Sequence, residues 1–408
     1  MAIKYLRTSN IKNKTVFLRV DVNEPIGEKG KVADDFRIQS VIPTIQFLRG
    51  QECKVIVCAH LGRPEGKRAQ SLSLKPVAEH LAKLLALKFV ETKDQVPEYP
   101  IPHVVFITGD IRKEVVQKSL KNSNSGNIIV LENIRFYPEE EANDVFFAKQ
   151  LAGIADVYVN EAFSVDHHKA ASLVAVTKYI PSYAGLVLER EIQSLNMVLL
   201  RPKKPFVVLM AGIKISDKAQ VLKNFAKKAD CILLGGGLAN LFFVSRGYEV
   251  GLSKVEHEEE QLAWEMDKNF KGKLLLPLDV VVANGKMDKN TIRVCAPHEV
   301  RKNELILDIG PKTIHTYAQK IKTAKTIIWN GPLGFFEHRP FHHGTTALAR
   351  IIGSVGTRKS FAVVGGGETV DAVRQAHQAS YIDLLSTGGG AMLEYLAGKK
   401  LPGIEALK

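Results

Sequence analysis

The chain has few cysteines and no long apolar run, so it lacks the usual sequence features of zinc-binding, disulfide-linked or membrane-spanning proteins. It has 408 residues but only four cysteines, at positions 53, 58, 231 and 295, and their spacing matches no zinc or redox motif. Cys58 and Cys231 stand in apolar runs, which predicts buried free thiols in a reducing cytoplasm. The most apolar long run, residues 231–244, is too short to span a bilayer and is interrupted by glycines.

Several motifs that would assign a common function are missing too. The N-terminal sequence MAIKYLRTSN contains no apolar segment, so we expect no signal peptide. No G-x-x-x-x-G-K-[ST] loop occurs, which argues against a P-loop enzyme, and no G-x-G-x-x-G follows the first expected strand, which argues against an ordinary dinucleotide dehydrogenase. The protein-kinase motifs are absent as well. We therefore expect a cytoplasmic protein outside these enzyme classes.

The composition is that of a globular protein with an excess of positive charge. Apolar residues make up 45% and charged residues 24% of the chain, and the formal net charge at pH 7 is +13. Nucleic acid, an anionic membrane surface or small anionic substrates could each account for this charge. Basic residues occur only in short runs such as Lys203-Lys204, whereas nucleic-acid binders tend to have longer basic runs or aromatic platforms. We expect neither a nucleic-acid nor a membrane partner, and steeply salt-dependent binding to unrelated nucleic acid would contradict this.

Apolar strand-like segments alternate with amphipathic helix-like segments along the chain, and its length favours two domains. The expected strands are residues 15–22, 54–59, 128–131, 156–159, 205–210, 231–234, 274–283, 326–329, 361–364 and 381–385. Such alternation predicts α/β domains with parallel sheets covered by helices. In these sheets ligands bind beyond the carboxyl ends of the strands, so the residues that follow each strand are the candidates for function.

One long amphipathic helix is expected at residues 185–200. Its apolar face carries Leu188, Ile192, Leu195 and Leu199. The sequence RPKKP at 201–205 ends this helix and is the best candidate for a domain boundary. The helix is therefore a candidate hinge.

Polar and cationic residues follow the expected strands of the first half. They are Asp21, Asn23, His60, Arg63, Arg135, His167, His168 and Lys169, and Arg37 would join them from the first helix. Taken singly, each has an ordinary explanation as a surface ion pair, a structural histidine or a turn former. Taken together, four successive strand ends that deliver anion-binding groups predict a cationic pocket, which would suit a phosphorylated carboxylic acid.

Three triple-glycine turns follow strands of the second half, at residues 235–237, 365–367 and 388–390. A glycine turn that opens a helix directs free N–H groups and a partly positive helix end at one point, which suits phosphate. For any single turn, a ligand-free strand–helix connection explains the glycines equally well. The repetition of the turn, with Lys214, Lys218 and Glu368 nearby, favours a nucleotide site.

Motifs along nearly the whole chain resemble, in order, those of the phosphoglycerate kinase family. They are RVDVNEP, DDFRI, AHLGRP, SLSLKPVA, LENIRF, VNEAF, GIKISDK, LLGGGLAN, LDIGPKT, WNGPLGFFE, VVGGGET and STGGGA. The resemblance implies two Rossmann-like three-layer α/β domains with parallel sheets joined by a hinge helix. It places a phosphoglycerate-binding domain at 1–184, the hinge helix at 185–200, a nucleotide-binding domain at 201–390, and a tail at 391–408 that packs back on the first domain.

The activity implied by the resemblance is phosphoryl transfer in glycolysis. A kinase of this family (EC 2.7.2.3) reversibly transfers a phosphoryl group between 1,3-bisphosphoglycerate and MgADP, giving 3-phosphoglycerate and MgATP, by in-line transfer with hinge closure. The resemblance also implies magnesium dependence and a cytoplasmic monomer.

By motif, the resemblance assigns roles to residues at both sets of strand ends. The implied phosphoglycerate ligands are Asp21, Asn23, Arg37, His60, Leu61, Gly62, Arg63, Arg135 and His168. The implied nucleotide ligands are Gly212, Lys214, Lys218, Gly235, Gly236, Gly237, Leu238, Asn330, Pro332, Glu337, Gly365, Gly366, Gly367, Glu368 and Thr369. The implied catalytic residues are Arg37, Lys214, Gly366 and Gly389, and Glu368 is the implied metal ligand.

The sequence departs from the family pattern at several of these motifs. His168 stands in place of an arginine, Glu368 and Glu161 in place of aspartates, Ile213 in place of a small residue and Glu24 in place of an apolar one. These departures leave a second hypothesis open, a reduced-activity or non-catalytic paralogue that binds phosphorylated ligands. The retention of the lysines, the catalytic arginine and all three glycine turns favours an active enzyme.

Overall fold

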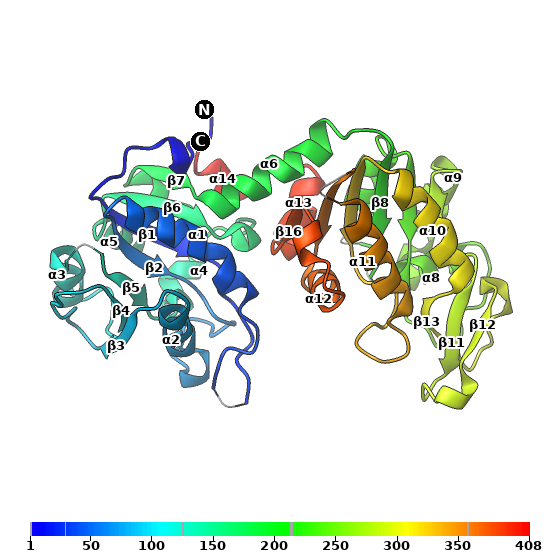
Figure 1. The fold of residues 1–408 in the computed structure, drawn as a ribbon, viewed down its shortest axis with the longest axis horizontal. Coiled ribbons are helices and arrows are strands. Elements are labelled where there is room, and N and C mark those ends of the chain that lie inside the picture. Colours follow the sequence, from blue (N-terminus) through cyan, green and yellow to red (C-terminus); the bar gives the residue numbers. More distant parts are fainter. Residues whose placement is uncertain (1, 29, 125, 213–214, 217, 357–358) are drawn as a thin grey trace. The chain divides into compact units, whose positions relative to one another are not determined.

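The computed structural model describes residues 2–28, 30–124, 126–212, 215, 216, 218–356 and 359–408. The chain divides into two compact units (Figure 1). The first contains residues up to 191 together with 400–408, and the second contains residues 192–399. Both ends of the chain therefore belong to the first unit.

The first unit is built on a parallel sheet of seven strands in the order β3-β4-β5-β2-β1-β6-β7. Its strands are β1 (Thr15–Val20), β2 (Lys54–Cys58), β3 (Lys88–Thr92), β4 (His103–Ile107), β5 (Ile128–Leu131), β6 (Val157–Glu161) and β7 (Ser182–Ala184). The four strands expected in this half of the chain are confirmed with slightly shifted ends. The strands β3, β4 and β7 were not predicted.

Most helices of the first unit bury apolar side chains in its core. They are α1 (Phe36–Gly50), α2 (Lys75–Leu84), α3 (Glu114–Asn122), α5 (Val145–Ala152) and α14 (Pro402–Glu405). The short helix α4 (Pro138–Glu141) buries Glu140 instead. Helix α1 packs beside β2 and α2 beside β3 and β4 (Figure 1), and α1 contributes Ile38, Val41, Ile45 and Leu48 to the core. The α/β organisation predicted from the apolar periodicity is therefore correct for this unit.

Helix α6 (Leu186–Leu200) begins in the first unit and continues into the second. It occupies almost the range predicted from its apolar face, and Leu188, Ile192 and Leu195 are buried. The division between the compact units falls inside the helix, between residues 191 and 192, rather than at its ends. The helix is thus a covalent connection whose two halves belong to different cores.

The second unit contains a six-stranded sheet in the order β10-β9-β8-β14-β15-β16, also parallel throughout. Its strands are β8 (Phe206–Met210), β9 (Cys231–Leu234), β10 (Leu274–Leu275), β14 (Thr326–Asn330), β15 (Phe361–Gly365) and β16 (Leu384–Ser386). Its helices are α7 (Ala219–Ala226), α8 (Gly236–Ser245), α9 (Glu260–Asn269), α10 (Pro311–Thr323), α11 (His343–Val355), α12 (Gly367–Gln375) and α13 (Gly389–Leu396).

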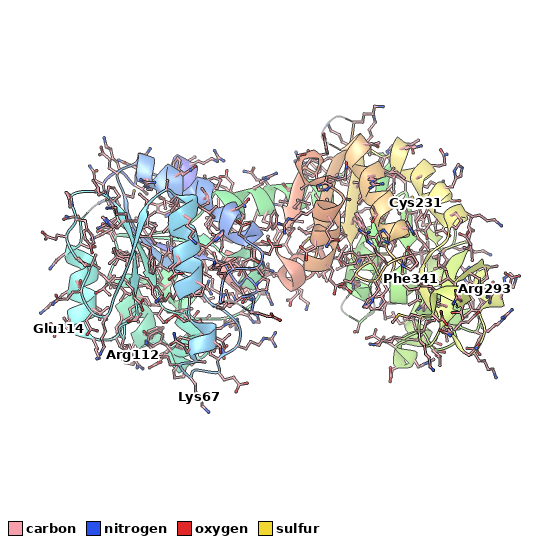
Figure 2. All side chains as sticks on the ribbon, turned by 60° about the horizontal axis from the view of Figure 1, so that its bottom comes forward. Lys67, Arg112, Glu114, Cys231, Arg293 and Phe341 are labelled. Carbon is pink, nitrogen blue, oxygen red and sulfur yellow. The ribbon has the colours of Figure 1, made fainter. Side chains whose placement is uncertain are left out.

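A small antiparallel sheet, in the order β12-β11-β13, adds to the second unit. It comprises β11 (Val280–Asn284), β12 (Arg293–Cys295) and β13 (Glu304–Ile309). Two residues labelled in Figure 2 stabilise it, since Arg293 pairs with Glu304 at 2.7 Å and Phe341 packs against Ala283 and Leu307. The sequence did not predict this sheet.

The single strand predicted at residues 274–283 is wrong. The segment divides into β10 and β11, which belong to different sheets. Pro277 lies between them and cannot donate a backbone hydrogen bond, which interrupts a ladder. Just before β11, the side-chain carboxylate of Asp279 accepts hydrogen bonds from the N–H groups of Lys312 and Thr313 at the start of α10.

The C-terminal segment that was expected to be a tail from residue 391 divides between the units. Residues 391–399, which include most of α13, belong to the second unit, and 400–408 belong to the first. In the first unit the N–H of Gly403 donates to the carbonyl oxygen of Asp166 at 2.9 Å, and Leu401, Ile404 and Leu407 are buried. Only these last residues therefore join the first core.

Two expectations from composition can be compared with the described residues. All four cysteines are free and buried, which confirms the prediction for Cys58 and Cys231. Burial raises the pKa of the Cys58 thiol to about 12, so it is protonated at neutral pH. Within the described residues, no helix has both the length and the apolar character needed to cross a bilayer.

Candidate functional site

The carboxyl ends of β1, β2 and β5 bring several predicted residues into direct contact. These strands are neighbours in a parallel sheet, so their ends lie at one edge. The N–H of Gly62, after β2, donates to Asn23 Oδ1, after β1, at 2.9 Å. Arg135 Nη1, after β5, donates to the carbonyl oxygen of Gly62 at 2.8 Å, and Leu61 is buried beside it. These hydrogen bonds place Asn23, Gly62 and Arg135 next to one another.

Arg37 reaches this edge from the first turn of α1. Its Nη1 lies 2.5 Å from Asp21 Oδ2, which also accepts a hydrogen bond from the Ser164 hydroxyl. Burial alone would raise the pKa of Asp21, but the charge of Arg37 and the hydrogen bond from Ser164 hold it below its ordinary value. Asp21 is therefore a carboxylate at neutral pH, and it anchors the guanidinium of Arg37.

His60 is buried and neutral at this edge. Burial and the nearby charge of Arg19 lower the pKa of His60 well below the ordinary value. Its Nδ1 lies 3.4 Å from Nη2 of Arg19. Because a guanidinium only donates, Nδ1 is the acceptor, and the proton of the neutral ring is on Nε2. His60 can therefore donate one hydrogen bond to an anionic ligand.

Arg63, His168 and Lys169 are the exposed members of the predicted set in the first unit. Burial is the main cause that lowers the pKa of Arg135, and the charges of Arg19 and Arg63 lower it further. The ring of His168 lies 3.9 Å from that of His167, centroid to centroid. His168 belongs to the same loop as Ser164, which binds Asp21, so the loop is tied to the cationic edge.

In the second unit, the ends of β14 and β15 are joined by hydrogen bonds between predicted residues. Asn330 Nδ2 donates to the carbonyl oxygen of Gly365 at 2.9 Å, and the N–H of Gly331 donates to Thr369 Oγ1 at 2.8 Å. Gly366 has φ +94°, and a Cβ there would lie 3.0 Å from Asn330 Nδ2. The turn therefore requires glycine at 366 for both its conformation and its space.

A second group of predicted residues joins the ends of β8 and β9. The N–H of Leu238 donates to the carbonyl oxygen of Gly212 at 2.6 Å. Gly236 has φ +58°, and a Cβ there would lie 3.1 Å from both Gly212 N and Pro332 O. A Cβ on Gly212 would lie 2.7 Å from Lys218 Nζ, so that amine approaches the same turn.

Each triple-glycine turn leads into a helix of the second unit. The helices α8, α12 and α13 begin at Gly236, Gly367 and Gly389. They follow β9, β15 and β16, which run parallel in one sheet, so all three helix N-termini lie at the same edge. This confirms the strand–glycine–helix pattern. Gly235 directly follows β9, and Gly237 lies in the first turn of α8. Such N-termini favour anionic groups.

Two predicted acids of the second unit, Glu337 and Glu368, are exposed. They form no hydrogen bond with the other predicted residues that the structure describes. Lys214 and Ile213 lie outside the described residues. Within the described residues no group of three or more metal-binding side chains is close enough to hold an ion. Glu368 stands in the first turn of α12, where an exposed carboxylate can complete a magnesium site together with phosphates.

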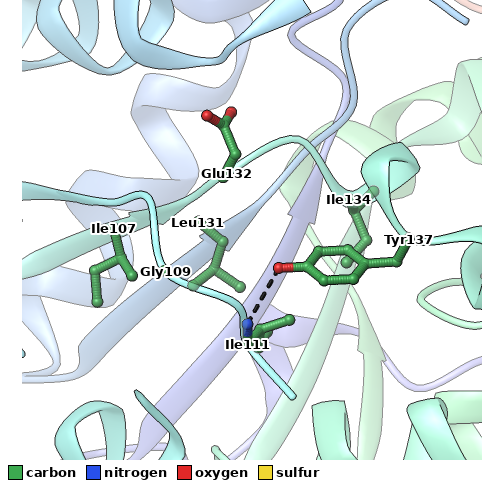
Figure 3. Close-up of a pocket in the computed structure, with 7 residues that line it drawn as sticks. All are labelled: Ile107, Gly109, Ile111, Leu131, Glu132, Ile134 and Tyr137. Atoms are coloured by element: carbon green, nitrogen blue, oxygen red, sulfur yellow. Dashed lines mark hydrogen bonds between the residues drawn. The ribbon is translucent and has the colours of Figure 1, made fainter. Parts of the chain in front are cut away.

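A hollow in the first unit is not a candidate site. Figure 3 shows its lining, which is Ile107, Gly109, Ile111, Leu131, Glu132, Ile134 and Tyr137. It has no space for a water-sized group, and the Tyr137 hydroxyl already accepts a hydrogen bond from the N–H of Ile111 at 3.1 Å. We regard it as a gap in the packing of β4 and β5.

Sequence reasoning missed the buried support beneath the cationic edge. Arg19 is 1% exposed, and its Nε donates to Ser172 Oγ at 2.9 Å. The Ser172 hydroxyl in turn donates to the buried carboxylate of Glu140 at 2.6 Å. The arginine inside the apolar run TVFLRV was a signal for such a network, because a charge in a central strand needs buried partners. No comparable signal marked Ser164.

A sequence model of the phosphoglycerate kinase family matches residues 6–399 of this chain. The chain belongs to the phosphoglycerate kinase family. The phosphoglycerate kinase of Pelotomaculum thermopropionicum is 40% identical over 410 residues, covering 100% of this chain and 99% of the relative. That of Moorella thermoacetica is 42% identical with the same coverage. The structure of phosphoglycerate kinase from Coxiella burnetii superimposes with a TM-score of 0.83 at 35% identity, covering 100% of this chain and 99% of that one.

Among phosphoglycerate kinase motifs, the aspartate-to-glutamate departure at position 161 has a clear structural role. Glu161 is buried at the end of β6, and its Oε2 accepts hydrogen bonds from the N–H groups of Val187 and Leu188 at 2.9 Å each. Its other oxygen accepts from the Thr44 hydroxyl. A Cβ at Gly185 would collide with this carboxyl group. Glu161 therefore caps the start of α6.

Proposed function

We propose that this protein catalyses the phosphoglycerate kinase reaction, the reversible transfer of a phosphoryl group between 1,3-bisphosphoglycerate and ADP. The products in the glycolytic direction are 3-phosphoglycerate and ATP. The observation that carries the proposal is the cationic edge of the first unit in a chain of this family. There Arg37, His60 and Arg135 come from three different elements and converge.

The first unit is proposed to bind the phosphoglycerate. Its donors suit an anion, since Arg37 and Arg135 are charged and neutral His60 offers Nε2–H. The residues assigned to this ligand are Asp21, Asn23, Arg37, His60, Leu61, Gly62, Arg63, Arg135 and His168. Asp21 also holds the guanidinium of Arg37 in place.

The second unit is proposed to bind the nucleotide at its glycine turns. The residues assigned are Gly212, Lys214, Lys218, Gly235, Gly236, Gly237, Leu238, Asn330, Pro332, Glu337, Gly365, Gly366, Gly367, Glu368 and Thr369. Helix N-termini and backbone N–H groups at Gly366 and Gly389 would hold phosphate oxygens. Lys214 is assigned to the moving phosphoryl group and Lys218 to the nucleotide phosphates.

The chemistry explains why no general base is needed. In the ATP-consuming direction the nucleophile is the carboxylate of 3-phosphoglycerate, which is already deprotonated at neutral pH. One of its oxygens bonds to the γ-phosphorus while the bond from that phosphorus to the ADP oxygen breaks, and no proton moves. The protein therefore acts by alignment and by placing Arg37 and the lysines against the charge on the transferring oxygens.

Magnesium is proposed to bind the nucleotide phosphates together with Glu368. A single carboxylate plus phosphates is the coordination magnesium commonly uses, and the exposed carboxylate at the start of α12 fits it. The ion would neutralise charge on the phosphates.

Two anionic substrates on separate units have to meet for transfer. We therefore propose that α6, at the hinge assigned to residues 185–200, allows the domain at 1–184 to close on the domain at 201–390. Closure would also exclude water from the acyl phosphate, which water could otherwise hydrolyse. The C-terminal residues that join the first unit would be carried with it. A cytoplasmic monomer without nucleic-acid or membrane partners completes the proposal.

A coupled assay with purified protein, ATP, magnesium and 3-phosphoglycerate tests the function. We expect oxidation of NADH by the coupling dehydrogenase that consumes 1,3-bisphosphoglycerate, dependent on all three components. Absence of turnover, with ADP still binding by calorimetry, would support the non-catalytic paralogue instead. The relatives reported above carry the name of the enzyme and do not favour that paralogue.

A further inference from the structure

Arg37 is anchored at three points, and one of them is an acid that no assigned role explains. Its guanidinium binds Asp21 at 2.5 Å, and its carbonyl oxygen accepts a hydrogen bond from the Ser40 hydroxyl at 2.6 Å. Its main-chain N–H donates to Glu24 Oε1 at 2.5 Å. Glu24 is 6% exposed, so this acid is kept out of water next to the site.

The contact with Glu24 replaces the usual helix cap. The N-cap residue of α1 is Asp35, and its side chain makes no capping hydrogen bond. Its carboxylate instead binds His80 at 2.9 Å and Gln39 at 2.8 Å. The first N–H groups of a helix have no partner within it, so the N–H of Arg37 relies on Glu24.

The surroundings of Glu24 make the carboxylate unfavourable. Burial raises the pKa of Glu24 to about 7, and Asp34 and Asp21 add repulsion, while the N–H and the charge of Arg37 oppose the rise. A buried acid beside two others adds little to folding, because its charged form loses hydration. The contact that remains to explain its position is the hydrogen bond it accepts from the N–H of Arg37.

We propose that Glu24 is a positioning residue, which acts through the main-chain N–H of Arg37 to hold that side chain where it meets the transferring phosphoryl group. The inference rests on the proposed function and deepens it. Three anchors around one arginine restrict both its backbone and its tip, which lowers the cost of ordering it for transfer. Glu24 touches neither substrate in this account.

Two substitutions of Glu24 distinguish the effect of its hydrogen-bond acceptor from the effect of its negative charge. Glu24→Gln keeps an oxygen that can accept from the N–H of Arg37, whereas Glu24→Met has similar size and no such acceptor. Glu28→Gln is the matched control, because Glu28 is an exposed acid in the same loop. Circular dichroism and ADP calorimetry on each variant establish that the protein is folded.

We expect Glu24→Met to lower kcat by about tenfold, a change in transition-state stabilisation of about 1.4 kcal/mol. The KM for ATP should not change, because the nucleotide residues belong to the other unit. Glu24→Gln should stay within about threefold of the unmodified protein. Equal kcat for Glu24→Met and Glu28→Gln would overturn the proposal, as would equal losses in both Glu24 variants.

The pH profile gives a second readout that a purely structural role would not move. Below pH 7 Glu24 becomes protonated, and a neutral carboxyl is a weaker acceptor for the N–H of Arg37. The ratio of kcat for the unmodified protein to that for Glu24→Gln should therefore fall from pH 8 to pH 6. A ratio that is constant over this range contradicts the proposal.

The amide signal of Arg37 in a proton–nitrogen NMR spectrum tests the contact without turnover. We expect it to titrate with a midpoint near pH 7 in the unmodified protein and to stay fixed in Glu24→Gln. Unmodified protein without turnover would contradict the proposed function, and this signal would then still decide whether Glu24 holds Arg37. An amide signal that is identical in Glu24→Met and the unmodified protein overturns the contact.

Discussion

His168 stands where the family motif implies an arginine. A histidine carries little positive charge at pH 7 and lacks the two parallel donors with which arginine holds a phosphate. His168 is exposed in the loop that Ser164 ties to Asp21, so a ligand can reach it. Its contribution to phosphoglycerate binding should therefore depend on protonation.

We predict that His168→Arg lowers the KM for 3-phosphoglycerate by on the order of tenfold at pH 8 and by less at pH 6. Arginine is charged at both pH values, whereas histidine as a residue type gains positive charge as the pH falls toward 6. Steady-state kinetics at both pH values measure the effect. The control is His315→Arg, which adds the same charge at an exposed position on α10. An unchanged KM in His168→Arg would refute the role of His168.

Glu368, in the first turn of α12, is the proposed magnesium ligand. Glutamate reaches one methylene further than aspartate but keeps the hard oxygen that magnesium prefers. We predict that the enzyme requires magnesium, and that Glu368→Ala raises the magnesium concentration for half-maximal activity by about tenfold. The KM for 3-phosphoglycerate should not change. Titrating activity with magnesium after chelation measures this, and activity that survives full chelation would contradict it.

The residues that sequence reasoning identified are those whose chemistry is visible in a short motif. Asp21, His60 and Arg135 follow strands that the apolar pattern predicted, and a parallel sheet necessarily brings such strand ends together. Arg19 stood out only as a charge within an apolar run, and its partners Ser172 and Glu140 are distant in the sequence. A local pattern can therefore indicate a buried charge but not the residues that pair with it.

At the scale of elements, α6 depends on a buried acid at its start. Burial raises the pKa of Glu161 to about 7, although the Thr44 hydroxyl and the N–H groups of α6 oppose the rise. The folded-state pKa lies above the unfolded value of 4.5, so the folded state binds this proton more tightly. Stability from this group is therefore greatest below pH 4.5 and is lost as the pH rises through about 7.

We predict that Glu161→Gln removes this dependence. Relative to the unmodified protein, the free energy of unfolding of the variant should rise between pH 4.5 and pH 8, by up to about 3 kcal/mol. Glutamine can still accept from the helix N–H groups, so the cap is retained. Urea unfolding at several pH values measures the difference, with Glu28→Gln as the exposed control. A difference that does not vary with pH would contradict the burial of charge at Glu161.

Several elements that the sequence failed to predict lack a long apolar run or the alternation with helices. The strand β3 (KFVET) is a partly exposed edge strand with charges at both ends of its apolar pair, so it lacks the apolar run of a central strand. The strand β7 has only three residues. The strands of the small antiparallel sheet are separated by short 3-10 turns and loops without an α-helix, so the alternation of strands and amphipathic helices did not mark it.

For the whole molecule, the sequence predicted two α/β parts joined by a hinge helix at residues 185–200. The compact units divide between residues 191 and 192, inside that range and before the proline-rich segment at 201–205. This happens because Leu188 is buried in the first unit while Ile192 and Leu195 belong to the second. A boundary that runs through a regular helix produces no change in composition.

The account as a whole depends on direct phosphoryl transfer between the nucleotide and the carboxylate. Phosphorus NMR of purified protein with ATP, magnesium and 3-phosphoglycerate observes that transfer without a coupling enzyme. Added hydroxylamine traps the acyl phosphate and draws the reaction forward. We predict that ADP accumulates with equal amounts of the hydroxamate of phosphoglycerate and of the inorganic phosphate that hydroxylamine displaces from the acyl phosphate. ADP that forms with free phosphate at the same rate when 3-phosphoglycerate is omitted, or no ADP at all, would contradict the account.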